Sequence, residues 1–257
     1  MLYDSHMHTA FSADSEMTAE DALRKAEQLG IGMVFTEHLD IGLPGKKEFC
    51  FDPEEYWKSY EPLRGNRLFL GVEIGMSPGA REENRAFAGR VPFDMVVGSI
   101  HMLDGTDLYY PAIYESREKQ ELYRAYFVSM AREVYQNDFI DVLAHIDYIA
   151  RYAIYEDPSL DYGVFGDEID AMLGALVATD TLLELNTRRL SDSKVLEELK
   201  PIYSRYRELG GRYVTIGSDA HTPDAIGAHF SLARDFAESC SLRPVTFCER
   251  RMEICRM

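Results

Sequence analysis

The chain has 257 residues, of which 44 are acidic and 27 are basic, so its formal net charge is −17. This excess of acid leaves no sequence-wide basic footprint and argues against nucleic acid or an anionic membrane surface as a partner. Hydrophobic residues make up 46% of the chain and charged residues 28%. These fractions are typical of a globular protein and exclude the disordered and fibrous classes.

The pattern of apolar and polar residues predicts short buried strands that alternate with longer amphipathic helices. In chain order we expect a strand over 2–6, a helix over 18–30, a strand over 33–37, a helix that begins at Asp52 and a strand over 68–73. The next elements are a strand over 94–101, a helix over 114–137, a strand over 140–145, a helix over 167–179 and a strand over 181–186. The last are a helix over 192–209, a strand over 213–219, a helix over 223–239 and a candidate short strand over 244–248.

This alternation implies βα units and therefore a parallel sheet. Seven units spread over the full length favour one α/β barrel over two smaller domains. Residues 1–257 are therefore predicted to form a single domain.

Neither the N-terminal segment nor the cysteines indicate export. Residues 1–14 contain no basic segment followed by an apolar run, and no run approaches the roughly 20 apolar residues that a membrane-spanning helix needs. The four cysteines form no C-x-x-C pair and are too few for a disulfide scaffold. We therefore expect a cytoplasmic location, reduced thiols and no membrane partner.

Six of the seven histidines and two acidic residues lie at the carboxyl ends of predicted strands, where α/β barrels build their active sites. These residues are His6, His8, His38, Glu73, His101, His145, Asp219 and His221. Residues i and i+2 of a strand face the same side, so His6 and His8 can bind one ion together. Imidazole and carboxylate suit zinc, manganese and iron. The pattern therefore predicts a metal centre at this rim.

Three other polar residues lead to different expectations. Asp14 follows His8 by six residues in a polar loop, where it is either a further ligand or a solvated turn residue. Glu37 precedes His38 and faces the opposite side of its strand, so we do not expect it to be a ligand. His229 falls in the last predicted helix and is expected to be structural or exposed.

These motifs resemble those of the PHP (polymerase and histidinol phosphatase) superfamily in order and in approximate spacing, over residues 2 to about 228. Within it, the histidinol-phosphate phosphatases are the most similar group. The phrases that carry this likeness are H-x-H-T-x-x-S-x-D at 6–14, GSIH at 98–101, AHID at 144–147, ELNT at 184–187 and GSDAH at 217–221. The resemblance implies a distorted (β/α)7 TIM-like barrel of the PHP type with three divalent metal ions, which would be zinc, manganese or iron.

The resemblance also implies how the ligands divide among the ions. The first ion would be held by His6, His8, Glu73 and Asp219. Glu73 would bridge to a second ion that His101 and His145 complete. The third ion would be held by Asp14, His38 and His221, with Asp14 at a position where many relatives carry a histidine.

The activity implied is hydrolysis of a small phosphomonoester, most closely L-histidinol phosphate in histidine biosynthesis, by a hydroxide that bridges two ions and attacks phosphorus. Glu73, Asp14 and Asp219 are then the expected catalytic residues, and the third ion, Asp14 or Asp219 would assist the leaving oxygen. Arginine matches phosphate bidentately. Arg151, Arg188 and Arg189 follow the fifth and sixth strands and are candidates to bind the phosphate.

Several alternatives stay open at this point. The chain could be a PHP phosphoesterase that acts on phosphotyrosine, nucleotides or nucleic acid, an amidohydrolase-like hydrolase, or a non-enzymatic subunit with a vestigial site. Specificity resides in loops, and the aromatic and acidic segments 104–114 and 152–166 are expected to cover the site. The oligomeric state is left undetermined by the sequence.

Overall fold

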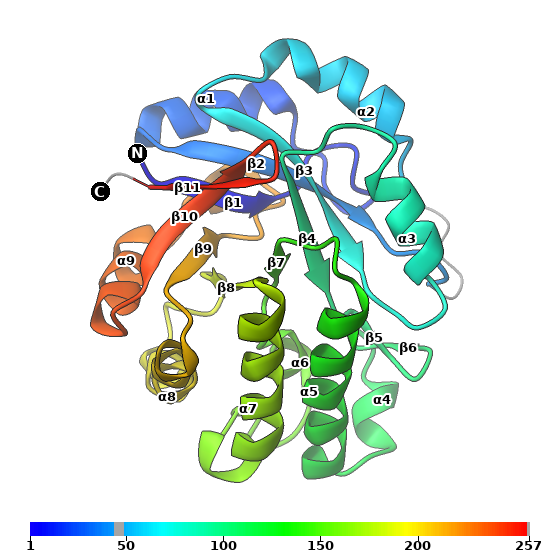
Figure 1. Ribbon diagram of the computed structural model, residues 1–257, viewed down its shortest axis with the longest axis vertical. Coiled ribbons are helices and arrows are strands. Elements are labelled where there is room, and N and C mark those ends of the chain that lie inside the picture. The colour runs from blue at the N-terminus through cyan, green and yellow to red at the C-terminus, as the bar shows by residue number, and fades with distance from the viewer. Residues whose placement is uncertain (44–48, 256–257) are drawn as a thin grey trace.

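A computed structural model of the chain describes residues 1–43 and 49–255. Seven parallel strands follow one another in chain order around its centre, and the helices lie outside them (Figure 1). These strands are β1 (Tyr3–Met7), β2 (Gly32–Leu39), β3 (Leu68–Gly75), β4 (Met95–Ser99), β7 (Val142–Leu143), β8 (Leu182–Asn186) and β9 (Tyr213–Gly217). The predicted number and order of barrel strands are therefore confirmed.

The chain beyond β9 returns to the first strand at the carboxyl rim. Met7 and Ala220 form a parallel bridge, the His8 N–H donates to the Ala220 carbonyl at 2.8 Å, and the Asp219 N–H donates to the His6 carbonyl at 2.8 Å. At its amino end, β9 pairs instead with β10 (Arg243–Cys248). β10 in turn pairs with the antiparallel β11 (Arg251–Ile254), the hairpin drawn in red in Figure 1. The first and last barrel strands are thus joined by backbone hydrogen bonds at the carboxyl rim, whereas β9 pairs with β10 at the amino end.

The helices that surround the strands bury their apolar faces on them. They are α1 (Ala19–Leu29), α2 (Pro53–Tyr60), α3 (Arg81–Ala88), α4 (Ala112–Glu115), α5 (Lys119–Gln136), α6 (Tyr148–Tyr152), α7 (Tyr162–Thr179), α8 (Ser193–Leu209) and α9 (Phe230–Ser239). Two 3-10 turns, η1 (Glu61–Leu63) and η2 (Pro223–Ala225), and a hairpin of β5 (Met102–Leu103) and β6 (Thr106–Asp107) complete the chain. Every residue of β2 and β3 is buried, as expected for parallel strands that are covered on both faces.

Helix boundaries follow capping residues that the sequence displays. The hydroxyl of Thr18 accepts the Asp21 N–H at the start of α1, and the carboxylate of Asp192 accepts the Lys194 N–H at the start of α8. Gly30 and Gly210 end the same two helices in left-handed conformations, with φ of 67° and 119°. These caps agree with the ends predicted for the two helices, at residues 30 and 209.

The prediction of a helix over 223–239 is wrong for the first half of that range. Gly227 and His229 both have left-handed backbones, with φ of 67° and 59°, and a helix cannot continue through them. The segment therefore forms η2, a turn and then α9. His229 lies just before α9 and is exposed, as expected for a residue outside the site.

Other boundaries also differ from the prediction. The helix expected over 114–137 is divided into α4 and α5, and α7 begins at Tyr162 rather than at 167, with Asp161 as its cap. Gly163 and Gly166 in the first turns of α7 weaken its helical pattern. β7 has two residues where six were predicted, and α3, α6 and β11 were not predicted.

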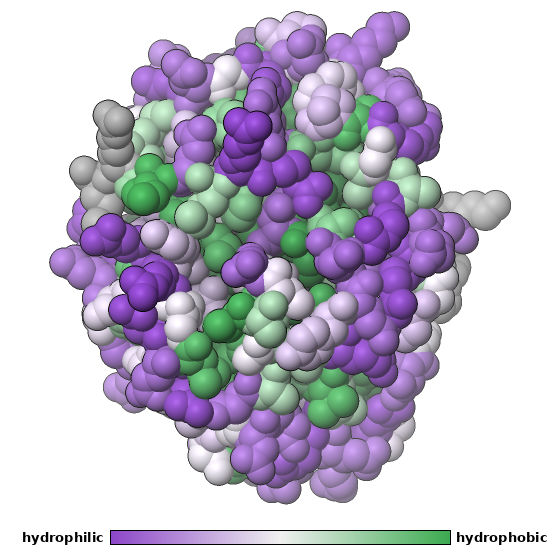
Figure 2. Space-filling model, viewed as in Figure 1, coloured by the Kyte–Doolittle hydropathy of each residue, from purple (hydrophilic) through white to green (hydrophobic). Residues whose placement is uncertain are grey.

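Hydrophilic side chains cover most of the face shown in Figure 2, with smaller apolar groups among them. Within the described part of the chain, none of the helices is both long and apolar enough to cross a membrane.

Candidate metal centre

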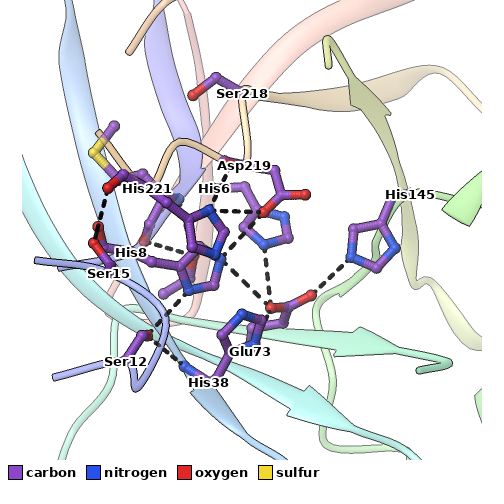
Figure 3. A network of polar contacts seen from close by, with 12 residues as sticks. His6, His8, Ser12, Ser15, His38, Glu73, His145, Ser218, Asp219 and His221 are labelled. Carbon is purple, nitrogen blue, oxygen red and sulfur yellow. Dashed lines mark hydrogen bonds and ion pairs between the residues drawn. The ribbon is translucent and has the colours of Figure 1, made fainter. Parts of the chain in front are cut away.

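A single carboxylate, that of Glu73, lies at the centre of the histidines that the sequence placed at the rim (Figure 3). Glu73 is on β3 and is completely buried. Its Oε1 lies 2.8 Å from His145 Nε2 and 3.2 Å from His101 Nε2. Its Oε2 lies 2.8 Å from His38 Nδ1, 3.4 Å from His6 Nε2 and 3.6 Å from His8 Nε2. Both oxygens therefore face imidazole nitrogens rather than water.

A second carboxylate, that of Asp219, extends the cluster on the side of His8. Its Oδ1 lies 3.4 Å from His8 Nε2 and 3.7 Å from His221 Nδ1. Asp219 has a φ of 54°, a left-handed conformation that is costly for a residue with a side chain. Such local strain is common at functional sites, and here it occurs where the chain beyond β9 joins β1.

A third group lies at the outer edge of the cluster. Asp14 Oδ2 is 3.2 Å from His221 Nε2 and 3.6 Å from His38 Nε2. The Asp14 side chain is partly exposed, whereas His38 is buried. All nine residues predicted to be ligands therefore lie in one continuous cluster.

Four of the imidazoles are oriented by a partner on Nδ1, which leaves Nε2 directed into the cluster. Nδ1 of His6 lies 2.7 Å from Glu184 Oε1, and Nδ1 of His101 lies 2.8 Å from Asp40 Oδ1. The same atom of His8 lies 3.2 Å from the Ser12 hydroxyl, and that of His221 lies 2.9 Å from the Asp219 carbonyl. Such outer partners fix the tautomer and the direction of histidines that bind metal ions.

Several buried polar atoms in this cluster form no hydrogen bond of normal geometry within the described residues, although some lie close to an oppositely charged group. They are His6 Nε2, His8 Nε2, His38 Nδ1, Glu73 Oε2 and His145 Nδ1. Unsatisfied buried groups are costly and rare, so a concentration of them requires an explanation. Imidazole nitrogens and carboxylate oxygens are the ligand atoms of zinc and similar ions, and this donor set fits divalent metal ions.

Among the described residues there are three sets of possible ligand atoms, and within each set all the atoms lie within 4.8 Å of one another. They are His6, His8 and Glu73; His38, Glu73 and His101; and His8, His38 and His221. The first set belongs to the first predicted ion. The other two combine residues that the family resemblance assigns to different ions, so the spacing alone indicates a multinuclear cluster without fixing how its ligands are divided.

The electrostatics of the cluster keep its acids ionised. Burial acts to raise the pKa of Glu73, but His6, His101 and His38 outweigh it and hold that pKa well below its usual range. Burial and the neighbouring His38 and His221 lower the pKa of His8, which keeps this imidazole neutral. Ionised carboxylates and neutral imidazoles are the states that bind metal ions.

His6 shows the opposite tendency. Burial acts to lower its pKa, but the carboxylates of Glu184 and Glu73 outweigh this effect and raise the pKa well above its usual value. Without a metal ion, a proton on His6 therefore compensates the buried carboxylates. A bound cation would take over that compensation and displace the proton.

A cavity of about 360 Å³ opens next to the cluster. Arg151 lines it, with Nη1 2.6 Å from Asp219 Oδ2, and so does Arg188, with Nη1 3.4 Å from the same oxygen. Arg189 does not line the cavity, because its guanidinium pairs with Asp147 Oδ2 at 3.1 Å. The structure thus separates the two adjacent arginines that the sequence could not distinguish.

Aromatic side chains also line the cavity. The Tyr148 ring lies 5.0 Å from the rings of both His101 and His145, Tyr152 lies 5.1 Å from Tyr148, and Tyr109 lies 5.0 Å from Tyr152. The Asp107 carboxylate also borders the cavity. The segments 104–114 and 152–166 therefore both contribute to the wall, although the second does so only through Tyr152.

Two acidic residues with a clear role were missed in the sequence. Glu184 orients His6 and accepts the His145 N–H at 2.7 Å, and Asp40 orients His101. Both carried a signal: Glu184 is the one charged residue of an apolar strand, and Asp40 stands two residues after His38, on the same side of its strand. Glu37 lies apart from the cluster, where it accepts hydrogen bonds from Thr9 and Ser12.

A parallel barrel with a cluster of histidines and acids at its carboxyl rim is the arrangement of a metal-binding hydrolase. The family model of the PHP domain matches residues 4–188, and the chain therefore belongs to the PHP family. This confirms the resemblance that the motifs indicated.

Similar proteins point to one group within this family. The chain is 47% identical to a probable histidinol-phosphatase of Clostridium acetobutylicum over 253 residues, which cover 98% of this chain and 99% of that protein. It is 30% identical to a histidinol-phosphatase of Lactococcus lactis, over 85% of this chain and 83% of that one. The fold is also similar to the crystal structure of the Lactococcus lactis histidinol phosphate phosphatase in complex with zinc, L-histidinol and phosphate. That match has a TM-score of 0.93 at 27% identity and covers 98% of both chains.

Proposed function

We propose that this chain is a metal-dependent phosphatase that hydrolyses L-histidinol phosphate to L-histidinol and phosphate. The observation that carries the proposal is one cavity with two kinds of lining. One part is the buried histidine–carboxylate cluster with Arg151 and Arg188, and the other is three tyrosines and Asp107. The first suits a phosphoryl group and the second suits an aromatic, cationic leaving group. The relatives named as histidinol-phosphatases support the same substrate.

The cluster would hold up to three divalent ions in the sets that the family resemblance implies. Bound ions would supply hydroxide at neutral pH and offset the charge that develops on the phosphoryl oxygens. Glu73 lies between the first two sets and fixes their relative position from the rigid strand β3. Zinc is the ion bound in the similar Lactococcus lactis structure, and zinc or manganese is the first choice for reconstitution.

The two arginines would bind the phosphoryl group. Arg151 is almost fully buried, and its guanidinium is held by Asp219 and lies 5.2 Å from the centre of the Tyr148 ring. Because it is already ordered, it loses little freedom when it donates hydrogen bonds to phosphate. Arg188 is about half exposed at the mouth of the cavity and can reach a second phosphoryl oxygen.

Asp14 is better suited to hold a metal ion than to donate a proton. Burial acts to raise its pKa, but hydrogen bonds with His221 and His38 outweigh this effect and lower the pKa well below its usual range. An acid that is ionised at neutral pH has no proton to give to a leaving oxygen. We therefore assign Asp14, together with Glu73 and Asp219, to binding and positioning the ions.

The aromatic wall would recognise the leaving group. Histidinol carries an imidazole and an ammonium group, and tyrosine rings offer stacking and cation–π contacts to both. The Asp107 carboxylate is within the same cavity and complements the positive charge. A nucleotide brings an aromatic base but no ammonium group, so it uses only part of this lining.

Three sequence predictions are retained as part of this proposal. They are a single domain over residues 1–257, a cytoplasmic location and the absence of a nucleic-acid partner. In support of the first, one sheet contains strands from β1 to β11.

A substrate panel tests the proposed function. The zinc- or manganese-loaded chain would be assayed with L-histidinol phosphate, p-nitrophenyl phosphate, a phosphotyrosine peptide and bis-p-nitrophenyl phosphate. We expect kcat/KM for L-histidinol phosphate to exceed the other values by about a hundredfold or more, because among these substrates it combines a phosphomonoester with a leaving group that is both aromatic and cationic. A preference for the phosphodiester or the peptide would overturn the proposal.

Asp107→Asn tests the leaving-group wall separately. We expect KM for L-histidinol phosphate to rise about tenfold, the amount that loss of one charged contact implies, while kinetics with p-nitrophenyl phosphate stay unchanged. Asparagine keeps the oxygen that accepts the Tyr109 N–H at 2.8 Å, so the loop should stay folded. Asp104→Asn in the same loop is the control, because Asp104 pairs with Arg117 outside the cavity. Equal losses with both substrates would contradict the assignment.

A further inference from the structure

Two adjoining cavities lie at the amino ends of the barrel strands, on the side of the barrel opposite the metal centre. The larger, of about 450 Å³, is bordered by Tyr213 and Arg243, the first residues of β9 and β10. The smaller, of about 200 Å³, shares Arg212 and Tyr213 with it and reaches Leu182, the first residue of β8. The proposed hydrolysis uses none of these residues.

The larger cavity is cationic in a chain that is strongly acidic. Arg207, Arg212, Arg234 and Arg243 line it. Arg234 pairs with the adjacent Asp235 at 3.0 Å, whereas the other three guanidinium groups form no ion pair or hydrogen bond within residues 1–43 and 49–255. Glu238 is the single acid among the lining residues in that part of the chain. With a net charge of −17, acids to pair with these arginines are plentiful elsewhere on the chain.

Ordinary structural roles account for only part of this arrangement. Arg207 is in the last turn of α8, where a cation complements the helix dipole. Arg212 and Arg243 lie outside helices, so the dipole does not explain them. The charges of these three guanidinium groups are not offset by an acid within the described chain, so an anion that lay between them would be bound favourably.

The smaller cavity has a different character. Leu176, Val177 and Leu182 contribute apolar surface, and Tyr206 and Tyr213 contribute rings. The Asp180 carboxylate at its edge can accept a hydrogen bond from an exocyclic amine. Because the two cavities share Arg212 and Tyr213, one ligand can occupy both.

We propose that these joined cavities bind a nucleoside polyphosphate. Its phosphates would lie among Arg207, Arg212 and Arg243, and its base would lie in the apolar space beside Tyr213. Arginine binds phosphate oxygens bidentately, and the combined space is of the size that small-molecule sites have. The site is separate from the metal centre, since Tyr213 begins β9 and the other end of that strand leads to Asp219 and His221.

Binding of ADP to the metal-loaded chain, measured by calorimetry, tests the proposal. Excess L-histidinol is included to occupy the catalytic cavity, and inorganic phosphate is left out because it would compete for the arginines of the proposed site. We expect one ADP per chain, and about tenfold weaker binding for each of Arg212→Gln and Arg243→Gln. Arg251→Gln is the matched control, because Arg251 is also exposed and without an ion pair in the described chain, yet lines neither cavity.

The other outcomes are equally decisive. No ADP binding, binding that L-histidinol abolishes, or binding that Arg212→Gln and Arg243→Gln leave unchanged would overturn the site. If tripolyphosphate bound as tightly as ADP, the proposed role of the apolar cavity in binding the base would be wrong. None of these readouts depends on hydrolysis, so they stand apart from the test of the proposed activity.

Discussion

The buried acids around the histidines set the chemistry of the rim at the scale of single residues. Glu73, Glu184 and Asp40 are all buried. Glu73 and Glu184 both lie beside His6, and Asp40 lies beside His101. A buried carboxylate costs several kcal/mol unless it is fully paired. Protons on histidines can compensate part of this charge, but they leave ring nitrogens of His8 and His145 unsatisfied. Divalent cations resolve both problems at once.

Glu184→Gln tests this reasoning. Glutamine keeps the size of the side chain but removes the charge that orients His6 and accepts the His145 N–H. We expect zinc affinity to fall about 10- to 100-fold, as is typical when an outer partner of a metal-binding histidine is removed. The measurement is competition with a chelating dye at fixed pH.

Glu198→Gln is the control for that change. Glu198 also accepts a backbone N–H, that of Leu160 at 2.6 Å, but lies outside the cluster. Equal zinc affinity in Glu184→Gln and the wild-type chain would show that Glu184 has no part in orienting a ligand.

Arg151→Ala tests the phosphate-binding wall. The guanidinium is the most deeply buried cation in the cavity, so its removal should lower kcat/KM for a phosphomonoester about 10²- to 10³-fold, through both a higher KM and a lower turnover. Steady-state kinetics measure this directly. Arg24→Ala is the control, because Arg24 also pairs with acids but is exposed on α1. Unchanged kinetics in Arg151→Ala would remove it from the site.

At the scale of elements, the sequence predicted the barrel strands better than the connections between them. The strands are buried on both sides and so read as apolar runs, which made all seven visible. α6 has five residues and α3 has eight, which is too short for helical periodicity to be distinctive. β7 is reduced to two residues because the chain turns at once to bring His145 to Glu73, a constraint of the site that local sequence does not show.

The sequence likewise predicted the residues at the strand ends of the site better than the contacts between them. Positions at strand ends identified the histidines and Glu73, because parallel strands bring their carboxyl ends together whatever the details of packing. The partners of those residues depend on side-chain directions across neighbouring strands. Glu184 reaches His6 from β8 to β1 across the barrel interior, and no spacing within the chain encodes that contact.

Close packing between strands gives a prediction at this scale. Gly217 ends β9, and a Cβ there would overlap the Glu184 carboxylate and His6 Cβ. We expect Gly217→Ala to destabilise the fold by about 1–3 kcal/mol and to weaken metal binding, because it displaces the pair that orients a ligand. Thermal unfolding and metal titration measure the two effects.

Gly174→Ala provides the contrast. Gly174 lies inside α7, and a methyl group on its Cα would meet no atom within 4 Å apart from its own helix backbone and chain neighbours. There alanine should stabilise the chain by about 0.5–1 kcal/mol. Similar effects of the two substitutions would show that strand packing at Gly217 does not constrain the site.

For the whole molecule, the net charge of −17 conceals a separation of charge. At the carboxyl rim, acids are gathered beneath the surface, and one of them, Asp219, pairs with Arg151 and Arg188. At the amino end, arginines without partners in the described chain line another cavity. The remaining acids repel polyanions in general, and within the described chain these two places are where we expect anions to bind.

Metal removal tests how far the whole fold depends on its centre. Ligands bound to the folded state stabilise it by about 4 kcal/mol at a free concentration a thousandfold above Kd. For a chain of this size that corresponds to about 10 °C in Tm. We expect a chelator to abolish hydrolysis and to lower Tm by about this amount, and added zinc or manganese to restore both. His6→Ala should lose the metal-dependent rise in Tm, whereas His229→Ala, which removes an exposed histidine outside the cluster, should keep it. A chelated chain that retained the Tm and activity of the metal-loaded form would show that the buried carboxylates are compensated by protons alone, and the proposed metal centre would then be wrong.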